Sequence, residues 1–377
     1  MIRKVRSRLG RLKRKILGID ASGKPLKFPA NQQEQFQLDE VFRSGFFDAD
    51  WYRLAYGESE TDPVKLFKHY VRTGIPNERD PNPYFNNVLY RRAFDVTLDN
   101  AFLHFISKGL ARSYGAFWDD QSFLKTQEDY RDKTETTIYK VNENPPRQFL
   151  VFLQSGEGTS WLDWPADEPR GWDLMVNHYD QKYRCQIKCE VELHQTGKLP
   201  GTKCTAFYDV LKKFPDLVEP YKYIALLDDD VVFKRWELTK LFSKVKSHAL
   251  QMAQASLSSE SSCSYPVFYH QSSSSRRVNG VEVMMPVFSQ SILLEVKALI
   301  GQSISGWGFD SALAMVASEK GWKARVMDEI IADHLKPINA DIGKFYQMLH
   351  KEGIFPEIEF THLQKKYSYT KPLFYEV

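Results

Sequence analysis

Three consecutive carboxylates, Asp228, Asp229 and Asp230, directly follow the apolar run Tyr223–Leu227. Like charges this close repel one another, so the arrangement is costly unless a positive group lies beside it. Hard divalent cations take oxygen ligands from one or two carboxylates and from substrate phosphates. The spacing therefore predicts a site for Mn²⁺ or Mg²⁺ held by Asp228 and Asp230, with Asp228 and Asp229 beside a bound diphosphate. A solvated acidic turn is the alternative interpretation.

Further along the chain, Gly306-Trp307-Gly308-Phe309-Asp310 places an aromatic face next to a carboxylate. A carboxylate beside a bound sugar can take the proton of an attacking hydroxyl as a general base. We therefore expect Trp307 and the earlier Glu282 to bind the sugar that receives the transferred group. Asp310 is the catalytic base if the reaction inverts the configuration of the sugar, and it orients the acceptor if the reaction retains it. The alternatives are a Trp packed in the core and Asp310 as a helix N-cap.

Three residues upstream of the carboxylates are candidates for binding a nucleotide donor. Ser155 lies in the Gly-rich stretch Gln154–Ser160, whose backbone N–H groups could approach a nucleotide, although the stretch matches no phosphate-loop pattern. Asp180 could accept hydrogen bonds from a base or a ribose, and it is equally well a turn residue. Lys203 lies at the predicted start of a helix, where it suits a phosphate or a sugar hydroxyl better than it suits the helix dipole.

These candidates follow segments with the patterns of strands and helices. Buried strands are predicted at 149–153, 172–178 and 223–227, another strand at 324–328, and an alternating strand pattern at 185–193. Helices are predicted at 201–214, 290–299 and 311–320, with an extended segment at 281–289. We therefore expect an α/β domain, in which ligands bind outside the carboxyl ends of the strands.

Asp228-x-Asp230 is the D-x-D arrangement of metal-dependent glycosyltransferases with the GT-A fold. Residues 148–340 resemble a family of GT-A-like bacterial and plant proteins long catalogued as a domain of unknown function. The resemblance implies a Rossmann-like, mixed and mostly parallel sheet, and a nucleotide-sugar transferase that uses Mn²⁺ or Mg²⁺. It also implies that His334 is the third metal ligand; a His without a ligand is the alternative. The matching motifs, in chain order, are 149–158, Trp172-Asp173, Gly201 with Lys203, Leu227–Asp230, Val281-Glu282 with Pro286–Phe288, Gly306–Asp310, and Asp328 with His334.

Two other functions compete with glycosyl transfer. Asp228-x-Asp230-x-Val232 fits the nucleophile loop of haloacid-dehalogenase-like phosphatases, in which the first Asp is phosphorylated. That family places the loop on an early strand and needs a later pair of acids, whereas here other strands precede it and no such pair follows. The third possibility is a non-enzymatic scaffold joined to a degenerate transferase domain. Retention of the three acids together with Asp310 and His334 argues against degeneracy.

Residues 39–135 contain an internal repeat. Phe46–Tyr52 is echoed by Tyr84–Tyr90, Phe67–Gly74 is echoed by Phe102–Gly109, and Phe117–Phe123 is a third, partial start. A period of about 30 to 40 residues predicts stacked helical units, each with an Asx N-cap, a short helix, a loop, a second helix and a final Gly. The repeat resembles aromatic, Asp/Tyr-rich repeats found beside bacterial polysaccharide glycosyltransferases, which implies a docking module. His69 and His104 occupy equivalent positions and are expected to pack.

Residues 1–20 carry eight Lys or Arg and one Asp, and Ile2, Val5, Leu9, Leu12 and Ile16 form one helical stripe. This pattern predicts a basic amphipathic helix in peripheral contact with an anionic membrane; a frayed tail, or an arm with non-specific affinity for nucleic acid, is the alternative. Residues 21–38 form a predicted linker, 148–345 the transferase domain and 346–377 a C-terminal extension.

Composition sets the remaining expectations. Hydrophobic residues make up 42% of the 377 residues, enough for a packed core, and no run of eighteen apolar residues occurs. The 4 cysteines form no C-x-x-C pair, which favours a reducing cytosol. The expected partners are a nucleotide-diphosphate sugar and a glycan or lipid-linked acceptor, with no specific nucleic acid. The expected location is the cytoplasm, including the inner face of the cell membrane, in surface polysaccharide synthesis.

Overall fold

The structure is a computed structural model, and it describes residues 42, 46–83, 85–87, 90–91, 101–105, 120–142, 144, 146–156, 170–180, 188–233, 235–334, 336, 344–369 and 374–377. The chain divides into two compact units, one of residues 1–123 with 364–371 and one of residues 124–363 with 372–377. The predicted basic helix at 1–20, the linker at 21–38 and residues 117–119 of the third repeat start lie outside the described residues. Within the described ranges, no helix is both long and apolar enough to span a bilayer.

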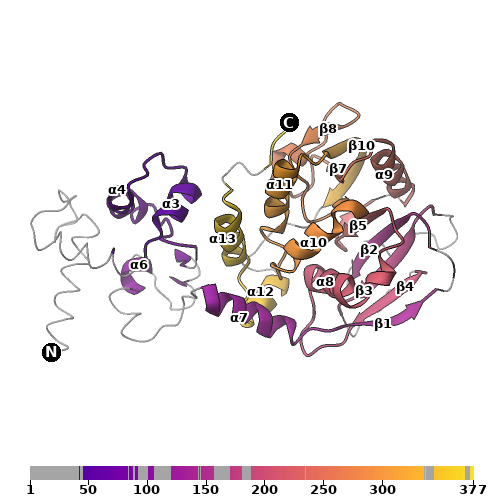
Figure 1. Ribbon diagram of the computed structural model, residues 1–377, viewed down its shortest axis with the longest axis horizontal. Coiled ribbons are helices and arrows are strands. Elements are labelled where there is room, and N and C mark those ends of the chain that lie inside the picture. Colours follow the sequence, from indigo (N-terminus) through magenta and orange to yellow (C-terminus); the bar gives the residue numbers. More distant parts are fainter. Residues whose placement is uncertain are drawn as a thin grey trace, which may run out of the picture. The chain divides into compact units, whose positions relative to one another are not determined.

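The first unit is helical where it is described (Figure 1), with α3 (Ala49–Tyr56), α4 (Pro63–His69), the π-helical turn η1 (Tyr70–Gly74) and α6 (Ala101–His104). Asp48 accepts a hydrogen bond from the backbone N–H of Trp51, and Asp62 caps α4 in the same way. Gly57, at φ 67°, ends α3. The predicted order of cap, short helix, loop and second helix is therefore confirmed for the first repeat.

Aromatic rings fill the core of this unit. Phe47 stacks on Tyr70 with 5.2 Å between ring centroids, and Phe85 meets Phe102 edge to face at 5.4 Å. Nδ1 of His69 lies 3.3 Å from the hydroxyl of Tyr52, so this His packs within the unit, as predicted. The side chain of His104 lies outside the described residues.

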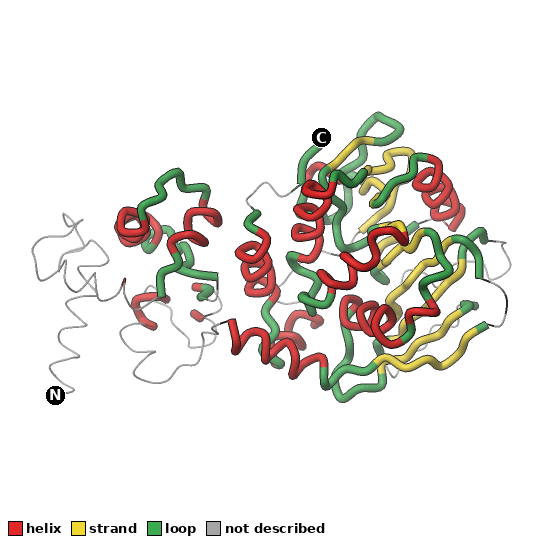
Figure 2. The backbone as a smooth tube through the Cα atoms, viewed as in Figure 1, coloured by secondary structure: helices red, strands yellow, loops and turns green. Residues whose placement is uncertain are grey.

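The second unit is built on one mixed sheet of ten strands (Figure 2), which confirms the predicted α/β class. The strands are β1 (Thr136–Val141), β2 (Phe149–Ser155), β3 (Asp173–His178), β4 (Val191–Gln195), β5 (Tyr223–Leu227), β6 (Val231–Val232), β7 (Met252–Leu257), β8 (Arg276–Val278), β9 (Val287–Ser289) and β10 (Ala324–His334). Their order is β1-β4-β3-β2-β5-β9-β7-β10-β6, with β8 also paired to β10. Strands β2, β3, β4, β5, β7 and β10 run in one direction.

Helices cover both faces of this sheet. Phe152 on β2 meets Phe207 on α8 (Lys203–Lys213), while Phe149 stacks on Phe242 of α9 (Arg235–Ser247). Phe149 and Phe152 are three residues apart on one strand and so point to opposite faces. The other helices are α7 (Asp120–Arg131), α10 (Leu293–Ile300), α11 (Phe309–Lys320), α12 (Lys344–Lys351) and α13 (Pro356–Tyr367), with 3-10 turns η4 (Pro215–Leu217), η5 (Pro266–Phe268) and η6 (Gln290–Ile292).

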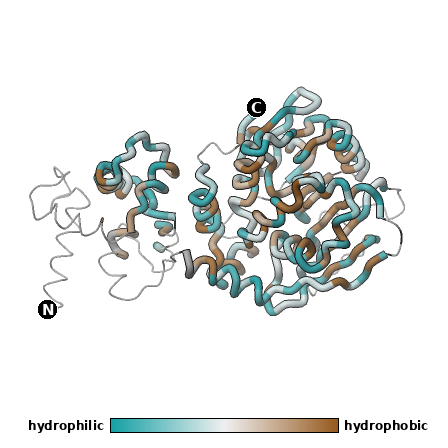
Figure 3. The backbone as a smooth tube through the Cα atoms, viewed as in Figure 1, coloured by the Kyte–Doolittle hydropathy of each residue, from teal (hydrophilic) through white to brown (hydrophobic). Residues whose placement is uncertain are grey.

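The central strands are apolar because both faces are covered. Leu150, Val151, Phe152 and Leu153 of β2 are fully buried, as are Ile224, Ala225, Leu226 and Leu227 of β5. Figure 3 shows hydrophobic residues along the strands of this unit. Such continuous apolar runs are typical of strands buried on both sides.

The strand order reverses between β2 and β5. From β2 the chain adds β3 and then β4 on one side, and it returns to place β5 on the other side of β2. In open α/β sheets, ligands bind at the carboxyl ends of the strands where the order reverses. Ser155 and Gly156 stand at the end of β2, and Asp228 directly follows β5.

Strand β10 is longer than the predicted strand at 324–328, and it runs to His334. Its register with β7 shifts between Met327 and Ile331, and its last two residues then pair with β6. An irregularity of this kind bends a strand and re-aims its side chains. The end of β10 is thereby brought beside the acidic turn that precedes β6.

Candidate active site

The acidic turn is held by the segment that precedes β9. The backbone N–H of Asp228 donates to the carbonyl of Met284 at 3.0 Å. Oδ1 of Asp228 lies 2.7 Å from the ammonium group of Lys203, with the side chains 30% and 8% exposed. Burial raises the pKa of Asp228 to about 6, with Lys203 opposing the rise and Asp230 adding to it. Lys203 is thus the positive group that the three carboxylates require.

Lys203 is fixed by the start of α8. Thr202 and Thr205 form a capping box, which sets the first turn of the helix. The ammonium group of Lys203 also donates to the carbonyl of Val283 at 2.6 Å. Lys203 therefore positions Asp228 and the 283–284 backbone, and its predicted contact with a phosphate or sugar stays a prediction.

Asp230 and His334 face each other because β6 pairs with the end of β10. His334 stands opposite Val231 in the antiparallel ladder, and its Nε2 lies 3.6 Å from Oδ1 of Asp230. Nδ1 of His334 lies 2.9 Å from the carbonyl oxygen of Ser262. Because a carbonyl can only accept, Nδ1 carries the proton, and Nε2 presents its lone pair to the carboxylate unless a second proton or a cation lies between them.

Asp230 and His334 stabilise each other's charged forms. Burial would lower the pKa of His334, but the carboxylate of Asp230 outweighs burial and raises it. Burial would likewise raise the pKa of Asp230, and His334 outweighs it, helped by Lys336, whose ammonium group lies 3.8 Å from Oδ2. The pair therefore accommodates one positive charge between its two halves.

The predicted ligand set fits a divalent cation in part. A carboxylate oxygen and an imidazole nitrogen bound to one cation at about 2.1 Å lie about 3.0–3.4 Å apart, close to the Asp230–His334 separation. An imidazole that donates its other N–H to a backbone carbonyl is the usual arrangement of a metal-bound His. Asp228 is turned toward Lys203, however, and Asp228, Asp230 and His334 do not bring three donor atoms within 4.8 Å of one another.

Tyr179 connects the end of β3 to the acidic turn. Its hydroxyl donates to Oδ2 of Asp229 at 2.7 Å, and burial raises the pKa of Asp229 against this hydrogen bond. A Cβ at Gly156 would lie 2.2 Å from the ring of Tyr179, so only Gly allows the ring to cross the end of β2. Of the predicted donor-binding residues, Ser155 is fully buried, and the charge of Asp180 helps to raise the pKa of Tyr179.

Glu282 is 5% exposed, and its carboxylate lies 3.5 Å from the thiol of Cys263. Burial raises the pKa of Glu282 to about 8, and the nearby charge of Asp310 adds to the rise. The next residue, Val283, contacts Lys203 through its carbonyl and Asp310 through its backbone N–H. The segment Glu282–Met284 therefore brings the predicted acceptor-binding and catalytic residues together with the acidic turn.

Asp310 lies in the first turn of α11, but it is not the N-cap. That position is held by Gly308, at φ 81°, so the N-cap interpretation is wrong. The Asp310 carboxylate is buried and accepts from the backbone N–H of Ser311 at 2.7 Å. Burial raises its pKa to about 6, against the hydrogen bonds from Ser311 and Val283.

Trp307 is half-buried, and its indole N–H donates to the hydroxyl of Tyr346 on α12 at 3.2 Å. The two rings meet edge to face with centroids 6.0 Å apart. The loop before Trp307 is fixed by buried Glu359, which accepts from the backbone N–H of Ile304 at 2.7 Å and of Ser305 at 2.8 Å.

Sequence reasoning missed four residues of this site: Tyr179, Cys263, Tyr346 and Glu359. Tyr179 could have been found from the sequence, because it directly follows the predicted strand at 172–178, at the edge of the sheet where ligands bind. The other three meet the site only through contacts across long sequence separations. Asp328, which belongs to the motifs that match the GT-A-like family, has a structural role. It forms a buried ion pair with Arg276, with Nε and Oδ2 2.9 Å apart.

Comparison with known proteins adds little to this geometry. No family model and no curated protein matches the sequence. Among solved structures, the chain is similar to A197 from STIV, with 12% identity over 50% of this chain and 85% of that chain and a TM-score of 0.32. A likeness at this level carries no argument about the chemistry of the site.

Proposed function

We propose that this protein is a metal-dependent glycosyltransferase with a GT-A-like domain, which moves a sugar from a nucleotide-diphosphate sugar to a hydroxyl of a glycan or lipid-linked acceptor. The observation that carries the proposal is the pairing of Asp230 with His334, three residues beyond the end of β5, which is one of the two strands between which the strand order reverses. Nε2 of His334 and the carboxylate of Asp230 face each other at a distance that one bound cation would bridge.

In this proposal Asp230 and His334 hold Mn²⁺ or Mg²⁺, with Asp228 as the third predicted ligand once it exchanges part of its contact with Lys203. A bound cation would neutralise the charge that develops on a diphosphate leaving group. Lys203 keeps Asp228 oriented, and Tyr179 orients Asp229 toward the same edge. Ser155 and Asp180 stand on the side of this edge where we place the nucleotide.

Two buried carboxyl groups divide the proton chemistry. With pKa values of about 6 for Asp310 and about 8 for Glu282, Asp310 is ionised and Glu282 is protonated at neutral pH. Environments that separate two pKa values in this way assign the roles of base and acid. Asp310 would take the proton of the acceptor hydroxyl, and Glu282 would donate a hydrogen bond to the sugar.

The indole of Trp307 and the phenol of Tyr346 form a wall of aromatic carbon with polar tips. Tyr346 accepts the N–H of Trp307, and its hydroxyl keeps its own proton to donate to a sugar oxygen. We assign this wall to the acceptor sugar. In the same proposal the repeats of the first unit dock the enzyme to partner proteins, and residues 1–20 contact an anionic membrane surface. The acceptor is then a molecule of bacterial surface polysaccharide synthesis.

The test is thermal unfolding of the full chain with a panel of nucleotide-diphosphate sugars, with Mn²⁺ and with EDTA. A ligand at 100 times its dissociation constant stabilises the folded state by about 2.7 kcal/mol. We expect a shift with one nucleotide that requires the metal and is lost in Asp230→Asn. The matched control is Asp216→Asn, an exposed Asp on η4, which should keep the shift.

A folded protein that shows no metal-dependent shift with any nucleotide would overturn the proposal. Release of phosphate from a phosphate monoester, lost in Asp228→Asn, would favour the phosphatase instead. Binding of a protein partner that is unaffected by Asp230→Asn, with no nucleotide binding, would favour the scaffold.

A further inference from the structure

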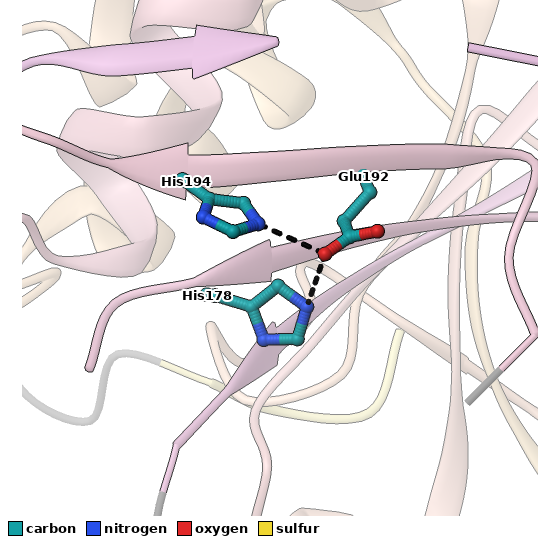
Figure 4. Close-up of side chains that lie close together, drawn as sticks. All are labelled: His178, Glu192 and His194. Carbon is teal, nitrogen blue, oxygen red and sulfur yellow. Dashed lines mark hydrogen bonds and ion pairs between the residues drawn. The ribbon is translucent and has the colours of Figure 1, made fainter. Parts of the chain in front are cut away.

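Two imidazoles and a carboxylate converge on strands β3 and β4. Glu192 and His194 are two residues apart on β4, so both side chains point to the same face of the sheet. His178, the last residue of β3, stands directly opposite His194 in the parallel ladder. Figure 4 shows both rings directed at one oxygen of Glu192.

The spacing of the donor atoms matches one coordination sphere. Nε2 of His178 lies 3.5 Å from Oε1 of Glu192, and Nε2 of His194 lies 2.9 Å from the same oxygen. Ligand atoms at about 2.1 Å from a tetrahedral zinc ion lie about 3.4 Å apart, a value between these two separations. Across the described ranges, this is the one group of three such side chains with donor atoms within 4.8 Å of one another.

The three side chains are held in place before any ion binds. His178, His194 and Glu192 have side chains only 2%, 12% and 20% exposed. The ring of Tyr139 on β1 stacks on His194, with centroids 4.6 Å apart and 22° between the planes. Ligands that are already ordered lose little conformational entropy on binding.

The chemistry of the three donors suits a metal. A neutral imidazole carries one N–H and one lone pair, so each ring can turn either a proton or a lone pair at Nε2 toward Glu192. Neutral imidazole nitrogens and a carboxylate oxygen are the usual protein ligands of zinc. One divalent ion at the point where the three donors converge satisfies all three groups together.

We propose that His178, Glu192 and His194 bind one transition-metal ion, with Zn²⁺ the best match. Imidazole suits zinc, copper, iron and nickel, whereas carboxylates and phosphates suit magnesium and manganese. This site has two imidazoles, whereas the one proposed at Asp230 has one imidazole and two carboxylates, and it does not rest on the glycosyltransferase proposal. Three protein ligands leave the fourth tetrahedral position to a water molecule or a further ligand.

An ion at this site would act on the neighbouring acidic turn. It would join the carboxyl ends of β3 and β4, and Tyr179, the donor to Asp229, directly follows His178. His178 is also in register with Ser155 on β2. The site therefore reinforces the edge of the sheet at which the strand order reverses.

The experiment uses the full chain, stripped with a chelator and titrated with Zn²⁺ against a chromophoric competitor. Bound metal is then counted by mass spectrometry. We expect one Zn²⁺ per chain, and at least a 100-fold weaker affinity in His194→Ala and in Glu192→Gln. Glu192→Gln keeps the shape of the side chain, so it tests the site even if His194→Ala fails to fold. Co²⁺ in place of Zn²⁺ should give the visible absorption of a tetrahedral ion.

Two variants provide the controls. His248→Ala removes an exposed His at the end of α9 and should leave the affinity unchanged. Asp230→Asn should also retain one Zn²⁺ per chain, which separates this site from the acidic turn. Equal zinc affinity in the wild type and in Glu192→Gln, or no zinc bound by the folded wild type, would overturn the proposal.

Discussion

The ammonium group of Lys203 lies 2.7 Å from a carboxylate oxygen of Asp228, and it joins the first turn of α8 to the end of β5. The same group donates to the carbonyl of Val283. The Lys203 side chain thus holds together three segments that are distant in the sequence. It also supplies the positive charge without which three adjacent carboxylates would repel one another.

Removing this ammonium group should destabilise the second unit. Losing one partner of a fully buried ion pair costs about 3–5 kcal/mol, and Asp228 is 30% exposed, so we expect about 1–3 kcal/mol for Lys203→Ala. Urea unfolding measures this cost. Lys212→Ala, at an exposed position of the same helix, should change the free energy of unfolding by less than about 0.5 kcal/mol. Equal effects of the two substitutions would contradict the assigned role of Lys203.

Stability should depend on pH through Glu282. Burial raises its pKa from 4.5 to about 8, so the folded state keeps a proton that the unfolded state loses. The resulting stabilisation is complete below pH 4.5 and is lost as the pH rises through about 8. The loss amounts to at most about 5 kcal/mol.

The matched variant is Glu282→Gln, which stays neutral at every pH. We expect it to equal the wild type in free energy of unfolding at acidic pH and to exceed it at alkaline pH. Urea titrations across this range measure the difference. Parallel pH profiles for the two proteins would show that Glu282 does not carry the shifted pKa.

The loop that carries Trp307 should depend on Glu359. Its carboxylate accepts from the buried backbone N–H of Ile304 and the partly buried backbone N–H of Ser305, so Glu359→Ala leaves both unpaired. At about 1–3 kcal/mol for each, we expect a loss of about 2–6 kcal/mol. Hydrogen exchange of a peptide spanning residues 303–308 should accelerate. Glu352→Ala, which breaks a surface pair with Lys133, should leave that exchange unchanged.

Asp328 and Arg276 form a buried ion pair in which both carboxylate oxygens accept a hydrogen bond. Nε and Nη2 of Arg276 donate to the two carboxylate oxygens at 2.9 and 3.0 Å, and the side chains are 4% and 0% exposed. Asp328→Asn leaves the guanidinium uncompensated, which should cost about 3–5 kcal/mol in urea unfolding.

The adjacent residue offers a control for this pair. Glu329 pairs with Lys240 and Lys244 at the surface, where solvent screens the charges, so Glu329→Gln should have a much smaller effect than Asp328→Asn. A cost for Glu329→Gln as large as that for Asp328→Asn would mean that burial does not set the strength of these pairs.

Local sequence patterns predicted several of the strands and helices of the second unit. The apolar runs at 149–153 and 223–227 became β2 and β5, and the segments after Thr202 and Gly308 became α8 and α11. Such elements are set by residues close in sequence, through burial on both faces of a strand and through capping of a helix. The positions of Asp228 and Asp230 after β5 followed directly, whereas Asp310 lies inside the first turn of α11 and not before the helix.

The amino-acid sequence by itself determined which side chains stand at the ends of strands and helices. Only the tertiary structure decided which of them meet. His334 reaches Asp230 because β10 bends and pairs with β6, and His178 reaches His194 because β3 and β4 pair in one register. Registers depend on the packing of the whole sheet, since a shift of one residue turns every side chain to the other face. No local pattern at 178 or 194 carries that information.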